Sequence, residues 1–167
     1  MDCRKHNLVN LYSRYSALLL FTFCCGSFLT LLYIPAEKAV PNVKISIVLI
    51  ASALILTAAF STSLCSRGII PVLSAAFGAV SAYAAYTVCF MLVPDRKSGV
   101  CLAAFMLVAV PLHFVIGTEG MAETDFFIGC FGKETGAKKI LINMYISVIV
   151  AVTVSVLSAG LIVWINK

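Results

Sequence analysis

Charge is scarce in this sequence, because only 11% of its 167 residues are charged while 62% are hydrophobic. Soluble domains carry about a quarter charged residues, so an ordinary water-soluble core does not explain this composition. A spanning helix needs roughly 20 apolar residues, and five spans with their connections use nearly the whole length. We therefore expect one all-α transmembrane domain over residues 1–167, a polytopic integral membrane protein whose first partner is the lipid bilayer.

The sequence also lacks the common catalytic motifs. H-E-x-x-H, G-x-S-x-G, the P-loop and C-x-x-C do not occur, and the only histidines are His6 and His113. A zinc protease, a nucleophile elbow, a phosphate cradle and a redox dithiol are therefore not indicated. The predicted spans contain no Asp or Glu, which leaves a carboxylate relay without residues. We expect no enzyme activity, no metal and no cofactor.

Cysteine, in contrast, is frequent, with seven residues in the chain. Most of them fall in or beside apolar stretches, where a thiol acts as a small packing group. Cys89 and Cys101 flank one short turn and could form a disulfide if that side of the membrane is oxidising.

Long apolar runs divide the chain into five spans. The predicted spans cover residues 16–34, 45–64, 69–93, 98–117 and 140–165, and residues 118–139 form the one sizeable loop. Residues 65–68 leave so short a connection that the second and third spans must form a tight antiparallel hairpin. Gly117, Gly120 and Gly129 in or beside the loop are expected to break any long helix there.

The positive charges lie near the ends of these spans. Seven of the twelve Lys and Arg residues fall on the side of the N-terminus and five on the opposite side. The positive-inside rule therefore favours a cytoplasmic N-terminus, in what we expect to be a bacterial cytoplasmic membrane. Charges placed this way suit anionic headgroups, and we expect no nucleic-acid partner.

Small residues recur at a spacing of four in three spans, a pattern that lets helices approach closely in lipid. The candidate packing residues are Thr22, Gly26 and Thr30 in the first span, Ser74, Gly78 and Ala82 in the third, and Ser147, Ala151, Ser155 and Ala159 in the fifth. These residues could pack within the chain or against a partner, which could be a second copy in a homo-oligomer. The alternative is that their spacing arises by chance.

Two polar side chains are further candidates. His113 follows Pro111 near the end of the fourth span, where it could bond to the carbonyl that the proline frees or reach headgroup water. Gating or proton sensing is the alternative role. Arg67, in the tight turn, could snorkel to the interface or bind a lipid phosphate or a partner carboxylate.

An apolar cluster within the long loop is the candidate docking site for a partner. It consists of Phe126, Phe127, Ile128 and Phe131, set among acidic residues and glycines. Such a cluster can lie on the membrane interface or contact another protein.

The order of these features resembles the stage II sporulation protein M family of small five-span membrane proteins. The resemblance rests on Gly26 in an opening span behind basic residues, and on a charge-free second span that leads through Ser66, Arg67, Gly68 and Pro71 into a Gly- and Ser-rich third. Lys97, Ser98 and Gly99 then precede a fourth span that contains Pro111, and a variable loop and a long last span follow. The resemblance implies a non-catalytic scaffold that anchors cell-wall-remodelling enzymes at the membrane.

Two functions are therefore expected from the sequence. The first is a non-catalytic scaffold or assembly subunit that binds other membrane or cell-envelope proteins. The alternative is a membrane subunit of a transporter or a channel-forming oligomer, suggested by the Gly, Ser and Thr residues in several spans.

Overall fold

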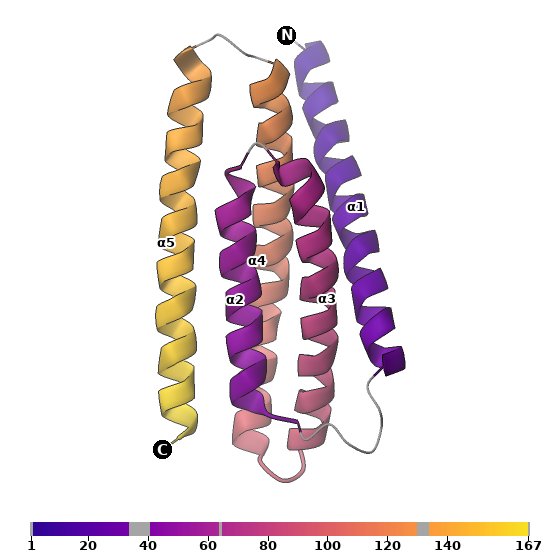
Figure 1. Cartoon of the computed structure of the whole chain (residues 1–167), viewed down its shortest axis with the longest axis vertical. Coiled ribbons are helices and arrows are strands. Elements are labelled where there is room, and N and C mark those ends of the chain that lie inside the picture. The colour runs from indigo at the N-terminus through magenta and orange to yellow at the C-terminus, as the bar shows by residue number, and fades with distance from the viewer. Residues whose placement is uncertain (1, 34–40, 64, 130–133, 167) are drawn as a thin grey trace.

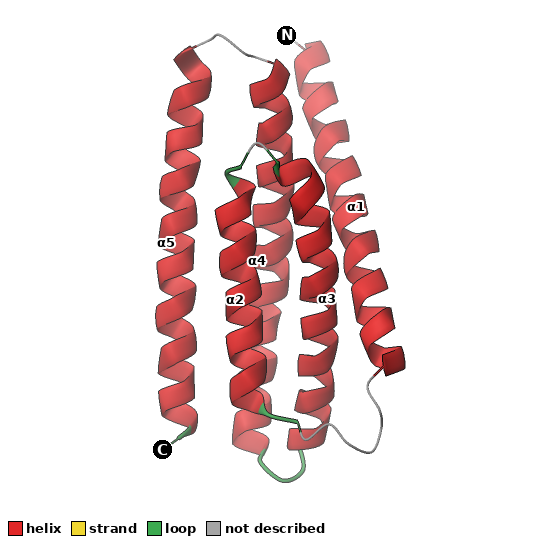
Figure 2. Cartoon of the chain, viewed as in Figure 1, coloured by secondary structure: helices red, strands yellow, loops and turns green. Residues whose placement is uncertain are grey.

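The computed structural model describes residues 2–33, 41–63, 65–129 and 134–166 (Figure 1). Side chains of residues 2–10, 126–129, 134–140 and 143 lie outside this description. The helices are α1 (Asp2–Tyr33), α2 (Val43–Ser61), α3 (Ser66–Met91), α4 (Arg96–Gly129) and α5 (Glu134–Ile165). Within the described residues, helices are the only regular elements (Figure 2).

All five helices are long and apolar enough to cross a membrane. The prediction of an all-α, multi-pass membrane protein is thereby confirmed. The tight hairpin is confirmed as well, since α2 ends at Ser61 and α3 begins at Ser66. Backbone hydrogen bonds close the turn, with the Ser63 amide donating to the Phe60 carbonyl at 3.1 Å and the Ser66 amide to the Ser63 carbonyl at 3.1 Å.

The predicted loop over residues 118–139 was wrong. The fourth helix does not stop at Gly117 but continues to Gly129, and α5 begins at Glu134. The glycines do not break the helix, because Gly117 and Gly120 sit where α4 meets other helices too closely to leave room for a side chain. A Cβ on Gly117 would lie 2.9 Å from the Leu19 side chain, and one on Gly120 would lie 2.6 Å from Ser61 Cβ.

The helices are arranged around α3 and α2. Helix α1 packs along α3, α4 packs against both α2 and α3, and α5 packs along α2. Figure 1 shows α1 and α5 at opposite sides of the bundle, with α4 behind the α2–α3 hairpin. Helices α4 and α5 barely touch each other, which leaves α5 attached mainly through α2.

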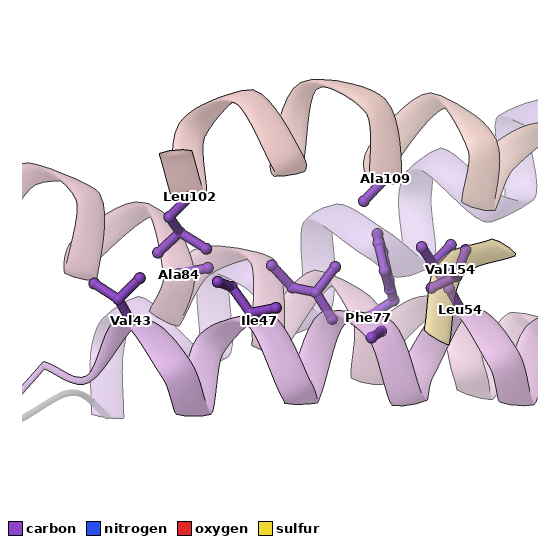
Figure 3. Packing of buried hydrophobic residues seen from close by; sticks show 10 residues of the cluster. Val43, Ile47, Leu54, Phe77, Ala84, Leu102, Ala109 and Val154 are labelled. Carbon is purple, nitrogen blue, oxygen red and sulfur yellow. The ribbon is translucent and has the colours of Figure 1, made fainter. Parts of the chain in front are cut away.

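The main hydrophobic core lies between the hairpin and α4 (Figure 3). Ile47 and Leu54 of α2, Phe77 of α3 and Leu102 of α4 are almost completely buried there. Val154 is the one buried core residue from the described part of α5. The outward faces of the helices carry exposed Leu, Val, Ile and Phe side chains, as expected for surfaces that face lipid.

Helix length divides the bundle into two parts. With 19 residues, α2 is about 28 Å long, close to the thickness of the hydrocarbon core. Helix α4 has 34 residues and is about 50 Å long, so it must extend beyond that core. In Figure 1 the ends of α1, α4 and α5 rise past the α2–α3 turn, at the end of the bundle where the chain begins. We call this the N-terminal end.

Candidate functional site

Glycines bring the backbones of α1 and α3 into direct contact. A Cβ on Gly26 would lie 1.9 Å from the Ala75 carbonyl oxygen, and a Cβ on Gly78 would lie 2.1 Å from the Phe23 carbonyl oxygen. Across the same contact, the Ser27 hydroxyl donates to the Gly78 carbonyl at 2.9 Å. The small residues of these two helices therefore pack within the chain.

The other small residues of α1 and α3 have mixed roles. Ser74 is buried and its hydroxyl donates to the Leu19 carbonyl at 3.0 Å, which adds a further α1–α3 contact. Ala82 is buried as well. Thr22 and Thr30 instead donate to carbonyls of their own helix, at 3.0 Å to Leu19 for Thr22 and 3.0 Å to Gly26 for Thr30.

In α5 the predicted small-residue stripe is only partly packed. Ser147 and Ala151 are half-buried, and the Ser147 hydroxyl lies 3.4 Å from that of Ser61 on α2. Ser155 and Ala159 are exposed. Within this chain the face of α5 that contacts the core instead carries larger residues, Val150, Val154, Leu161, Ile162 and Ile165, so packing of Ser155 and Ala159 against a partner stays a prediction.

A polar cluster joins α1, α3 and α4 at the N-terminal end. The guanidinium of Arg67 lies 2.7 Å from the Asp125 carboxylate. Tyr15 donates its hydroxyl proton to Asp125 and accepts a hydrogen bond from Arg67 at 3.2 Å. One turn away, the Tyr12 hydroxyl donates to Glu119 at 3.0 Å. Arg67 thus binds a carboxylate of its own chain, a partner for which the sequence offered no local signal.

Buried hydroxyl groups attach the hairpin turn to α4. The Ser66 hydroxyl donates to the Gly120 carbonyl at 3.1 Å and also pairs with the Thr124 hydroxyl. Thr124 approaches the Ser63 carbonyl at 3.4 Å. These hydrogen bonds lie beside the close contact between Gly120 and Ser61. Together, the bonds and the contact hold the turn against the extended part of α4.

A cavity of ≈ 400 Å³ lies beside this attachment, between α2, α4 and α5. Its polar lining consists of Glu119, Glu123, Ser61 and Ser147, and its other lining residues are Val115, Ile116, Gly120, Ile146 and Val150. These carboxylates were not predicted to belong to a site, because the fourth span was predicted to end at Gly117. Their spacing of four residues places both on one face once α4 is known to continue.

A second cavity, of ≈ 640 Å³, lies between α4 and α5 at the opposite end. Arg96 and Lys97 stand at its polar margin, and Lys97 lies 4.1 Å from the centre of the Trp164 ring. The remaining lining is apolar and consists of Val100, Cys101, Ala104, Phe105 and Leu161. The two cavities therefore have opposite charges at their margins.

His113 lies in the middle of the bundle. Its ring stacks on Phe77 with centroids 4.2 Å apart, and Nδ1 lies 3.2 Å from the Thr57 hydroxyl. Nε2 is buried and has no hydrogen-bond partner. The predicted position near headgroup water was wrong, because α4 continues to Gly129 and His113 is completely buried.

The candidate docking cluster is only partly covered by the structure. The backbones of Phe126, Phe127 and Ile128 form the end of α4, which corrects their assignment to a loop, but their side chains lie outside the described residues. Phe131 lies outside them altogether. Cys89 and Cys101, considered above as a disulfide pair, are both free thiols.

Among the described residues, no group of three or more His, Cys, Asp or Glu side chains could hold a metal ion. Comparison with protein families, curated proteins and solved structures finds no match to this chain.

Proposed function

We propose that this protein is a non-catalytic assembly subunit of the membrane, a scaffold that binds other membrane or cell-envelope proteins. One observation carries the proposal: the polar side chains at the N-terminal end join helices to one another. Arg67 contacts Asp125 and Tyr15, Tyr12 contacts Glu119, and Ser66 contacts Thr124. Groups engaged in this way stabilise a platform and do not converge on a reacting atom.

The outer surface supports the same function. Helix α5 contacts the bundle mainly through α2, and much of its length remains exposed. Apolar surface of this kind can bind lipid or the spanning helices of other proteins. By its resemblance to the stage II sporulation protein M family, the bound proteins would be cell-wall-remodelling enzymes. From the same resemblance we infer a bacterial cytoplasmic membrane, and from the distribution of Lys and Arg we infer that the N-terminus lies in the cytoplasm.

Co-purification tests the scaffold directly. The full-length tagged protein is extracted from its native membranes in mild detergent and separated on a native gel, and the bands are identified by mass spectrometry. We expect a reproducible complex that contains defined partner proteins and is absent from a parallel purification of an unrelated five-span protein. Migration of the chain alone in repeated extractions contradicts the proposal.

A transport subunit is the second candidate, and the ≈ 400 Å³ cavity favours it. Glu119 and Glu123 could attract a cationic solute there, and Ser61 and Ser147 could donate or accept hydrogen bonds. However, this cavity lies at one end of the bundle, and the lining of the cavity at the other end is almost entirely apolar. Solute-dependent flux in reconstituted vesicles, lost in Glu119→Gln/Glu123→Gln, is the result expected of a transporter.

A further inference from the structure

The ≈ 640 Å³ cavity lies between the first turns of α4 and the last turns of α5. Figure 1 shows these turns at the end of the bundle opposite the N-terminal end. The cavity follows α4 from Arg96 to Phe105, a length of about 13 Å at the rise of an α-helix. Its volume falls within the range of small-molecule sites, about 300–1,000 Å³. The cavity is therefore large enough to hold a ligand of its own.

Hydrocarbon is the occupant that the lining of this cavity favours. Cys101, Ala104 and Phe105 line it from α4, and Leu161 and Trp164 line it from α5. Because α4 and α5 barely touch each other, the chain itself does not close the space between them. Water would find almost no polar partner there, and an unfilled apolar space loses dispersion contacts. In a membrane, an acyl chain satisfies this surface.

The margin of the cavity is basic. Arg96 and Lys97 are exposed, and a cation–π contact keeps the Lys97 ammonium 4.1 Å from the centre of the Trp164 ring. Asp95 lies beside them, and its carboxylate accepts hydrogen bonds from Ser98 and attracts Lys97. Among the described residues, none forms an ion pair with Arg96. The margin therefore offers a guanidinium and a net positive charge to an anion.

We propose that this cavity binds an anionic phospholipid. Arg96 and Lys97 bind its phosphate, and one acyl chain lies in the apolar part of the cavity between α4 and α5. A planar guanidinium suits phosphate oxygens, and basic pockets between spanning helices favour anionic headgroups. Trp164, near the end of α5, suits the level of those headgroups. The site is independent of the scaffold function, and its lipid completes the packing of α5 against α4.

The length of the cavity favours a lipid over a spanning helix of a partner. Such a helix crosses a hydrocarbon core about 30 Å thick. The cavity extends about 13 Å along α4, close to half of that thickness, and so matches a single leaflet. A partner helix would contact it only at one end, whereas one phospholipid occupies both its basic margin and its apolar part.

Quenching of tryptophan fluorescence tests the site in the full-length native protein. Trp164 lines the cavity and is the chain's one tryptophan, so its emission reports on this position. Phosphatidylglycerol or phosphatidylcholine with brominated acyl chains, which quench on contact, is titrated into the protein in an uncharged detergent. We expect quenching by phosphatidylglycerol to saturate near one lipid per chain. It should need about one-tenth of the concentration of phosphatidylcholine, as one charge-assisted contact implies.

Charge variants locate the headgroup. Arg96→Gln/Lys97→Gln should raise the half-saturating concentration of phosphatidylglycerol about tenfold and leave that of phosphatidylcholine unchanged. The control Arg14→Gln/Lys44→Gln removes the same two charges from exposed positions elsewhere and should change neither. The native protein gives the same comparison without a substitution. Raising the ionic strength from about 0.1 to 1 M shortens the Debye length from about 10 to 3 Å and should weaken only phosphatidylglycerol.

A cavity-filling variant locates the acyl chain. Ala104→Phe places a ring in the apolar part of the cavity and should abolish saturable quenching of Trp164 by either lipid. Ala76→Phe adds the same ring at an exposed position of α3 and should leave the quenching curve unchanged. Equal curves for these two variants would show that the acyl chain does not enter the cavity.

Three further outcomes overturn the proposal. Equal or unsaturable quenching by the two lipids shows contact with bulk lipid only. Displacement of brominated phosphatidylglycerol by inorganic phosphate at the same concentration assigns the basic margin to a free anion. Protection of Trp164 by a co-purified protein assigns the cavity to a partner. Co-purification tests the scaffold function separately, so failure of the lipid site leaves that function standing.

Discussion

Gly26 and Gly78 illustrate how single residues set the distance between helices. In lipid, helices gain little from the hydrophobic effect, so close contact between backbones supplies much of the attraction. The carbonyl oxygens that face these glycines lie closer than any Cβ can approach. The residues themselves therefore determine how closely α1 and α3 can pack.

Replacing Gly78 by Ala should destabilise the protein. The new methyl group would meet the Phe23 carbonyl oxygen at 2.1 Å, and overpacking of this kind costs about 1–3 kcal/mol. Gly160→Ala is the matched control, because nothing lies within 4 Å of its added Cβ. Unfolding by SDS titration in detergent measures both variants. Equal stability of the two would show that α1 and α3 do not pack through this glycine.

His113 behaves as a core residue in this structure, and its substitution separates packing from function. His113→Phe keeps an aromatic ring against Phe77 and removes the unpartnered Nε2. Thr57 stays satisfied because its hydroxyl also donates to the Ala53 carbonyl at 2.9 Å. We expect the free energy of unfolding of His113→Phe to lie within about 1.5 kcal/mol of that of the native protein. His113→Ala leaves a cavity, and we expect its free energy of unfolding to fall by about 2–5 kcal/mol.

Partner capture completes the test of His113. If the imidazole only packs, His113→Phe binds partners as the native chain does at every pH. A folded His113→Phe variant that loses binding, or loses its pH dependence, would instead assign a functional role to the ring.

At the scale of the element, α4 depends on how its first turn is capped. The Asp95 carboxylate accepts hydrogen bonds from the Ser98 hydroxyl and, at 3.2 Å, from the Ser98 amide. These bonds hold the pKa of Asp95 below its ordinary value, with the hydroxyl contributing most. A carboxylate that accepts a hydrogen bond from a backbone amide without a partner inside the helix stabilises the start of that helix.

The sign of the resulting pH dependence follows from that lowered pKa. The contribution of Asp95 to stability is fully present above the ordinary pKa of an aspartate and is lost as the pH falls through the lower pKa of the folded state. Because Asp95 is exposed, the effect is small. Asp95→Asn, which can cap the helix without titrating there, should show a weaker decrease of melting temperature in acid. Identical acid profiles for both proteins would contradict this assignment.

Helix α4 also shows where sequence reasoning succeeded and where it failed. Apolar runs predicted five helices because a segment in lipid must satisfy its backbone hydrogen bonds internally, whatever its tertiary contacts. The end of α4 could not be predicted in this way, since Gly117 and Gly120 usually weaken a helix. Their packing against Leu19 and Ser61 is a tertiary effect, and it overrides the local preference.

The polar cluster was hidden from the sequence for a related reason. Tyr15 and Asp125 are separated by 110 residues, so no local pattern links them. The spacing of Glu119 and Glu123 was visible, but it became informative only when their segment was known to be helical. Arg67 was predicted to snorkel to the interface or to bind a lipid phosphate or a partner carboxylate, and in the structure it binds the carboxylate of Asp125 in its own chain.

At the scale of the whole molecule, unequal helix lengths create a stepped N-terminal end. The α2–α3 turn lies below the ends of α1, α4 and α5 (Figure 1). The cluster of Tyr15, Arg67 and Asp125 sits at the level where the short hairpin stops and the long helices continue, since Arg67 lies in the first turn of α3. A tyrosine and charged side chains suit this position, which we assign to the membrane interface.

Labelling of native cysteines tests this stepped arrangement. In variants that each retain one cysteine, a membrane-impermeant maleimide should reach Cys3 and Cys65 from the same side of the membrane, because α1 begins and the hairpin turns at one end of the bundle. Cys65 should react more slowly, since the turn lies nearer the hydrocarbon. Cys24 is exposed on α1 but inside a span, so lipid should protect it until the protein is solubilised in detergent. Labelling of Cys3 and Cys65 from opposite sides contradicts the topology, and rapid labelling of Cys24 in intact membranes would mean that the outer face of α1 contacts water.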